Sequence, residues 1–185
     1  MSMRKDLGIC ALMILCVAID CAGRFAALSL DLPMWLDTAG TMLAAYALGP
    51  ACGAMAGGTF SLIFSDLSGN PLELCYAATS IAVGIIAGQA SRRGAFGSLF
   101  GALSLAFIVA LAATAISTPL NFLASGGMTS NQWGDGIIVL MTENGANQAL
   151  SCIIGQFYLE FPDKVASVLL LYAALRLHLL QKRIL

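Results

Sequence analysis

The fold of this chain is decided by the apolar stretch 37-DTAGTMLAAYALGPACGAMAGGTFSLIFSD-66, which has no charged residue between its two aspartates. A membrane-spanning helix needs about 20 apolar residues, so the stretch forms either one overlong helix or a hairpin of two short ones. The turn-forming pair Gly49-Pro50 lies near its middle. We expect a hairpin, and the charges of the rest of the chain support this choice.

The composition of the whole chain indicates lipid as its natural solvent. Its 185 residues are 59% hydrophobic and 10% charged, with a mean hydropathy of +0.87. A soluble domain of this size needs a mostly polar surface, which so few charges cannot supply. Disorder, nucleic-acid binding and secretion as a free domain are disfavoured for the same reason. We expect a single transmembrane domain over 1–185, an all-α compact bundle.

Turn and charge signals divide the chain into six expected transmembrane helices. They cover about 7–28, the two halves of 37–66, roughly 72–91, a segment from 95 to about 119–123, and part of 149–180. A polar, glycine-rich stretch follows the fifth helix and reaches Asn147. Because Pro162 interrupts the last segment, we expect a short outer helix over 149–160, a break, and then the sixth span.

The basic residues predict that both termini are cytoplasmic. With a hairpin in 37–66, all of the main basic positions fall on one side, as the positive-inside rule requires: Arg4, Lys5, Arg92, Arg93, Arg176, Lys182 and Arg183. A single span there would move Arg92-Arg93 outside. The carboxylates that then lie toward the outer face are Asp31, Asp37, Asp66, Glu73, Asp135, Glu143, Glu160 and Asp163. The outer mouth is therefore expected to be acidic.

The N-terminal segment favours a retained helix over a cleaved signal peptide. Its apolar character continues past Asp20 and Arg24 to about Leu30, beyond the length of a signal-peptide core. The six cysteines show no CxxC spacing and most lie in apolar runs, so we expect reduced thiols.

The first helix has two distinct faces. Ala18, Ala22 and Ala26 repeat every four residues and form a strip that permits close approach of a partner helix. Asp20 and Arg24, also four apart, lie on the other side, where they can pair with each other and face an internal pocket. The alternative is that the alanines are ordinary membrane-helix residues and the ion pair only supports packing.

Glycine pairs four residues apart predict tight packing between short helices. They are Gly49/Gly53, Gly53/Gly57, Gly84/Gly88 and Gly97/Gly101. With 19 glycines in the chain, packing within the bundle is the preferred interpretation of these pairs.

Polar side chains gather at the expected outer ends of the helices. Amides, carboxylates and one lysine beside aromatic rings form a mixed lining that can orient a small polar ring compound. The candidate substrate-binding residues are Trp35, Asp37, Asn70, Asn121, Trp133, Asp135, Asn144, Gln156, Glu160, Asp163 and Lys164. The tryptophans alone would also fit interfacial membrane anchors.

The sequence offers little for catalysis. The single histidine, His178, lies among leucines near the C-terminus, so a histidine-based metal cluster or a Ser-His-Asp arrangement is not available. Neither a phosphate loop nor a GxGxxG motif is present. We expect a protein that is not an enzyme and that has no cofactor, metal or bound ATP.

These features resemble the substrate-binding S component of an energy-coupling factor (ECF) transporter. The resemblance covers nearly the whole chain and rests on the segments LPMWLDTAGT (32–41), LGPACGA (48–54), GIIAG (84–88) and Pro162-Asp163-Lys164. It implies a six-helix receptor for a vitamin or vitamin precursor in the prokaryotic plasma membrane. It also implies as partners a T component, contacted by Ala18, Ala22 and Ala26, and two cytoplasmic ATPase subunits. Riboflavin is not assigned, because Phe161-Pro162-Asp163-Lys164 differs from the Pro-Phe-Asn of some riboflavin binders.

Two other functions stay open at this stage. One is a ligand-sensing membrane module of similar fold, coupled to a signalling partner. The other is a secondary transporter working alone, which would require internal repeats or deep proton-relay carboxylates. The ligand is also open, since an acidic mouth favours a neutral or cationic ligand whereas Lys164 offers a partner for an anion.

Overall fold

The computed structural model describes the backbone of residues 2–69 and 71–184 and the side chains of 5–69 and 73–177. Within this part, the chain forms α1 (Ser2–Ser29), α2 (Ala39–Leu48), α3 (Pro50–Ser68), α4 (Ala77–Arg92), α5 (Leu99–Ser125), α6 (Gln132–Glu143) and α7 (Gln148–Ile184). Two 3-10 turns, η1 (Pro71–Tyr76) and η2 (Ala95–Gly97), precede α4 and α5. No strand occurs in the described residues, which confirms the all-α class. Asn70 and the side chains of Arg4, His178, Lys182 and Arg183 lie outside the described residues.

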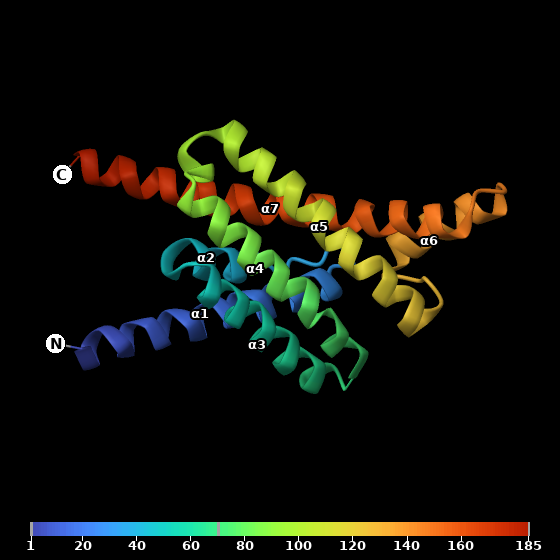
Figure 1. Cartoon of the computed structure of the whole chain (residues 1–185), viewed down its shortest axis with the longest axis horizontal. Coiled ribbons are helices and arrows are strands. Elements are labelled where there is room, and N and C mark those ends of the chain that lie inside the picture. Colours follow the sequence, from blue (N-terminus) through green and yellow to red (C-terminus); the bar gives the residue numbers. More distant parts are fainter. Residues whose placement is uncertain (1, 70, 185) are drawn as a thin grey trace.

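The helices form an elongated bundle in which both ends of the chain lie at the same end (Figure 1). Among the described residues, three helices are long and apolar enough to cross a membrane: Lys5–Ser29, Glu73–Arg92 and Leu99–Ser125. Large apolar side chains face outward, including Leu123 at 86% and Phe100 at 81% exposure. Such a surface suits lipid, and the chain has the features of a membrane protein.

The predicted hairpin at Gly49-Pro50 is confirmed. α2 ends at Leu48, and Pro50 opens α3 at a position where proline is well tolerated. Gly49 between them has φ +99, a conformation that only glycine adopts without strain. α2 and α3 therefore fold back on each other with no connecting loop.

The start of α2 is held by a side chain from α1. Asp20 is fully buried and its carboxylate accepts hydrogen bonds from Gly40 N at 2.7 Å, Thr41 N at 2.8 Å and Thr41 Oγ1 at 2.7 Å. These are the free donors of a helix N-terminus, and the helix dipole favours a negative charge there. The predicted pairing of Asp20 with Arg24 is therefore wrong, because Asp20 caps α2 instead.

Glycines bring α3 and α4 into backbone contact. A Cβ on Gly57 would lie 2.6 Å from Ser80 O, and one on Gly53 would lie 2.9 Å from Gly84 O. Gly88 in turn meets Pro50 of α3. The predicted packing role is confirmed for these glycines. Gly97 is different, since a Cβ there would meet open space.

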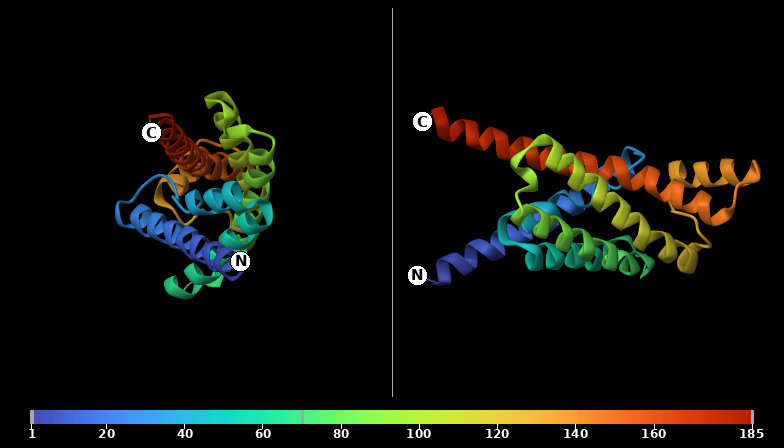
Figure 2. Two further views of the ribbon diagram at one scale, coloured as in Figure 1. Left: turned by 90° about the vertical axis from the view of Figure 1, so that its left-hand side faces the viewer. Right: turned by 45° about the horizontal axis from the view of Figure 1, so that its top comes forward.

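In the last third of the chain, one helix was not expected and one predicted break is absent. The stretch up to Asn147 contains α6, whose first turn is capped by Asn131 through a bond from Trp133 N to Oδ1 at 3.0 Å. The short helix expected over 149–160 is the first part of α7, which continues through Pro162 without a break. Figure 2 shows α6 running back along this part of α7.

α1 has the two faces that the sequence predicts. Ala18, Ala22 and Ala26 are exposed, whereas Asp20 and Arg24 are buried on the other side of the helix. The six cysteines are all free, as expected.

Candidate binding cavity

A cavity of about 790 Å³, including its open mouth, lies between the helices toward the end of the bundle that is away from the termini. Its lining comes from the last turns of α1, α3 and α5, the loop 30–38, η1, the start of α4 and the middle of α7. The lining includes four aromatic rings, those of Trp35, Phe60, Phe64 and Tyr76.

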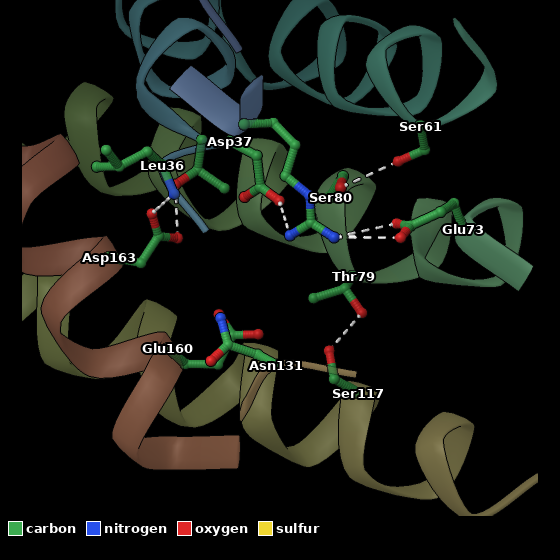
Figure 3. A network of polar contacts seen from close by, with 12 residues as sticks. Leu36, Asp37, Ser61, Glu73, Thr79, Ser80, Ser117, Asn131, Glu160 and Asp163 are labelled. Carbon is green, nitrogen blue, oxygen red and sulfur yellow. Dashed lines mark hydrogen bonds and ion pairs between the residues drawn. The ribbon is translucent and has the colours of Figure 1, made fainter. Parts of the chain in front are cut away.

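Arg24 joins three segments on one side of the cavity. Its Nη1 lies 3.5 Å from Asp37 Oδ2, and its Nη2 lies 3.2 Å from Glu73 Oε1 (Figure 3). The guanidinium carbon stacks 3.9 Å from the ring centroid of Trp35. Because Arg24 is buried, these contacts fix the loop 30–38 and η1 against α1.

Lys164 joins two carboxylates of its own helix on the other side. Its Nζ lies 2.7 Å from Glu160 Oε2, one turn earlier, and also contacts Asp163 Oδ2. All three side chains are at least nine-tenths buried. Such a cluster is stable only while the charges compensate each other.

Asp163 also ties α7 to the loop 30–38. Its Oδ1 accepts a hydrogen bond from Leu36 N at 2.7 Å, and its Oδ2 accepts one from Thr38 Oγ1 at 3.3 Å (Figure 3). Leu36 has φ +54, which costs a non-glycine residue conformational energy. The bond to Asp163 helps to hold this conformation, and with it the neighbouring Trp35 and Asp37.

A chain of hydrogen bonds crosses the cavity wall from η1 to α7. Tyr76 Oη donates to Asn121 Oδ1 at 2.6 Å, Asn121 Nδ2 donates to Gln156 Oε1 at 2.9 Å, and Gln156 Nε2 donates to Glu160 Oε1 at 2.8 Å. Every donor in this chain points toward Glu160. The amide groups are thereby fixed in orientation, which favours a site of defined shape.

The carboxyl group of Asp37 is set for proton exchange near neutral pH. Burial, and next the carboxylate of Asp163, raise its pKa to about 7, although Lys164 and Arg24 oppose the change. Asp37 lies in the loop 30–38, and 18% of its side chain is exposed. Its charge therefore depends on pH and on what enters the cavity.

Six of the predicted site residues line this cavity: Trp35, Asp37, Asn121, Gln156, Glu160 and Lys164. Asp163 lies behind them as a support for the loop 30–38. Asn70 lies outside the described residues.

Three other predicted site residues do not line it and make structural contacts elsewhere. Trp133 Nε1 donates to Asp31 O at 2.8 Å, Asp135 accepts from Thr129 N at 2.6 Å, and Asn144 Nδ2 donates to Leu140 O at 2.7 Å. Trp133 and Asp135 lie in the first turn of α6 and Asn144 follows its last turn; α6 packs along α7, and none of its residues lines the cavity.

Arg24, Glu73 and Tyr76 also line the cavity, although they are not among the candidate substrate-binding residues. The sequence does indicate that Arg24 faces an internal pocket, since a charge inside an apolar helix is costly unless it serves a site. Among the described residues, no group of three His, Cys, Asp or Glu side chains could hold a metal ion.

Comparison of the chain with known protein families, with curated proteins and with solved structures found no match.

Proposed function

We propose that this chain is the substrate-binding S component of an ECF-type importer, which binds a small vitamin or vitamin precursor and delivers it with a T component and two cytoplasmic ATPases. The observation that carries the proposal is the polar cavity inside an apolar helical bundle. Buried ionic groups in a membrane protein are costly and are expected where they serve a site. In a receptor, the aromatic rings, the fixed amides and the paired charges of this cavity would all contact or orient the ligand.

The proposed topology has six crossings, α1 to α5 and α7, with both termini cytoplasmic in the prokaryotic plasma membrane. The basic residues Lys5, Arg92, Arg93 and Arg176 lie on segments near the end of the bundle that holds the termini, in agreement with the positive-inside rule. α2 has ten residues and is too short to span alone. The loop 30–38, with Trp35 and Thr38 buried, folds over the outer end of α2 at the mouth of the bundle, outside the crossing itself. The cavity then opens toward the outside.

The exposed alanine strip of α1 supports a partner helix as the next step in transport. Ala18, Ala22 and Ala26 offer a surface without long side chains, and such surfaces allow close helix packing in lipid. The strip is on the opposite face from Arg24, so docking there does not compete with the ligand.

The proposal is tested with Ala22→Trp in cells that also express a T component and the ATPases. We expect the purified variant to bind its ligand as the unchanged protein does, while uptake is lost because the bulky ring blocks docking. Ala115→Trp, at an exposed position of α5, is the matched control and should retain uptake. Normal uptake by Ala22→Trp would show that the alanine strip of α1 is not the surface that binds the partner helix. Tight binding without uptake in the unchanged protein would favour a sensing module.

A further inference from the structure

We propose that the ligand of the cavity is a small organic cation, such as an amine or a protonated nitrogen heterocycle. This inference rests on the proposed function and specifies the chemical class of the ligand. The observation behind it is the imbalance of charge around the cavity.

Two cations are shared among four carboxylates. Arg24 lies between Asp37 and Glu73, and Lys164 lies between Glu160 and Asp163. With all groups ionised, the site carries two uncompensated negative charges. In a poorly solvated interior such an excess is costly, and a cationic ligand removes part of the cost.

The two cations are not available to an anionic ligand. Lys164 is 2% exposed and already contacts a carboxylate on each side. Both terminal nitrogens of Arg24 face carboxylates, and its plane is covered by Trp35. An anion would have to displace one of these carboxylates and would add to the negative excess. The expectation that Lys164 could receive an anion is therefore not supported by its surroundings.

Carboxylate surface does remain open to the cavity. The side chains of Asp37 and Glu73 are 18% and 20% exposed, and both line it (Figure 3). The buried Glu160, also in the lining, has no hydrogen bond to its Oε2 besides the ion pair with Lys164. Tyr76 and Phe60 add aromatic surface, which attracts cations as well as planar rings. These groups line the same cavity and offer negative and aromatic surface to a positively charged nitrogen.

The shape of the site favours an organic cation over a metal ion. Within the described side chains, no three metal-ligating groups converge. The cavity is open at its mouth, and much of its lining is aromatic or hydroxyl-bearing. A cation with an apolar or aromatic body satisfies both parts of the lining.

The experiment measures thermal stabilisation of the detergent-solubilised full chain by a panel of vitamins, vitamin precursors and metabolites in matched charge sets. Each set contains an amine, the corresponding alcohol and the corresponding carboxylate, for example tyramine, tyrosol and 4-hydroxyphenylacetate. We expect saturable stabilisation by one or more cations, and little by their neutral and anionic counterparts. Tighter binding of a neutral or anionic compound, or no stabilisation by any cation, would overturn the inference.

Glu73→Gln keeps the shape of the side chain and removes one negative charge, so it should weaken binding of the best cation about tenfold. Its apo form should be no less stable than the unchanged protein, since the charge excess falls. The control Asp66→Asn removes an exposed carboxylate of α3 at the same end and should leave binding unchanged. Equal affinity in the unchanged protein and in Glu73→Gln would also overturn the inference. An anionic or neutral ligand leaves the receptor function standing, whereas a panel without any ligand counts against that function itself.

Discussion

At the scale of single residues, Lys164 is predicted from the sequence to contact the ligand, but its burial gives it a structural role. The sequence places it beside Pro162 at the outer end of a helix, which predicts an accessible ammonium group. In the structure it lies in the interior of α7 and contacts two carboxylates, those of Glu160 and Asp163. Its loss therefore affects the fold before it affects ligand binding.

We predict that Lys164→Met destabilises the protein by about 3–5 kcal/mol, because it leaves Glu160 and Asp163 buried with no counter-charge. The measurement is thermal unfolding in detergent. The triple variant Lys164→Met, Glu160→Gln, Asp163→Asn removes the charges together and should recover part of the loss. A triple variant less stable than Lys164→Met would contradict this account.

Asp37 gives the cavity a pH dependence. Its raised pKa of about 7 means that the group is mostly ionised at pH 8 and mostly protonated at pH 6. The charged groups facing it are Arg24 of α1 and Glu160, Asp163 and Lys164 of α7. A proton and a cationic ligand therefore compete for the same carboxylate.

We predict that affinity for a permanently charged cation falls as the pH is lowered from about 8 to about 6, approaching tenfold per pH unit below the pKa of Asp37. Asp37→Asn should bind more weakly at pH 8 and show a flatter profile, since it has no proton to exchange. Isothermal titration at several pH values measures both. An affinity that increases on acidification would contradict the proposed competition between the proton on Asp37 and the cationic ligand.

At the scale of helices, backbone contact between α3 and α4 decides how closely the bundle closes. Gly84 has no room for a side chain, because a Cβ there would meet the backbone of Gly53 and Ala54. Ser61 and Ser80, which line the cavity and are joined by a 3.2 Å hydrogen bond, lie on the same two helices. A change at Gly84 therefore also alters the cavity wall.

We predict that Gly84→Ala destabilises the protein by about 1–3 kcal/mol, since overpacking forces the backbones of α3 and α4 apart. Gly8→Ala is the matched control, because Gly8 is also helical and a Cβ there meets nothing within 4 Å. The control should leave the melting temperature unchanged or raise it through better helix propensity. Equal effects of the two substitutions would show that the close contact between α3 and α4 at Gly84 does not determine the stability of the protein.

Local signals and distant contacts explain which elements the sequence predicts. The hairpin is predictable because Gly49-Pro50 specifies the turn locally. Six site residues are predictable because polar side chains are few in so apolar a chain. The course of α7 is not, because a proline locally favours a break, whereas the contact of Asp163 with Leu36 next to Pro162 comes from far away in sequence. α6 is not predictable from the sequence for another reason: the glycines near Asn131 indicate a loop, so Asn131 is not recognised as a helix N-cap.

At the scale of the whole molecule, the charges and the cavity define two different ends. α6 and the first turns of α7 lie at the end opposite the termini (Figure 1). In the proposed topology this end faces outward, and the connection between α6 and α7 lies outside the cell. The turn after Arg93, between α4 and α5, lies inside.

We predict that an epitope tag inserted between Asn144 and Gly145 is labelled by antibody on intact cells, because both residues are exposed at the end of α6. The same tag between Arg93 and Gly94 should be labelled only after permeabilisation. Comparison of the two insertions on the same cells measures the orientation. Labelling of the second tag alone on intact cells would invert the topology.

The position of Glu160, Asp163 and Lys164 in α7 has a consequence for biogenesis. The insertion machinery selects membrane segments by hydrophobicity, and each ion near the centre of a helix makes insertion less favourable by about 2.5–3.5 kcal/mol. It would therefore not readily insert α7 alone. Lys164 pairs with the two carboxylates within α7, but the hydrogen-bond donors to Asp163 from Leu36 and Thr38 are supplied by the loop 30–38, which is held against α1. Entry of the last helix into the bilayer and completion of the tertiary structure are then a single event. A chain damaged in the loop 30–38 would fail at assembly, and quality-control proteolysis would remove it before ligand binding could be tested.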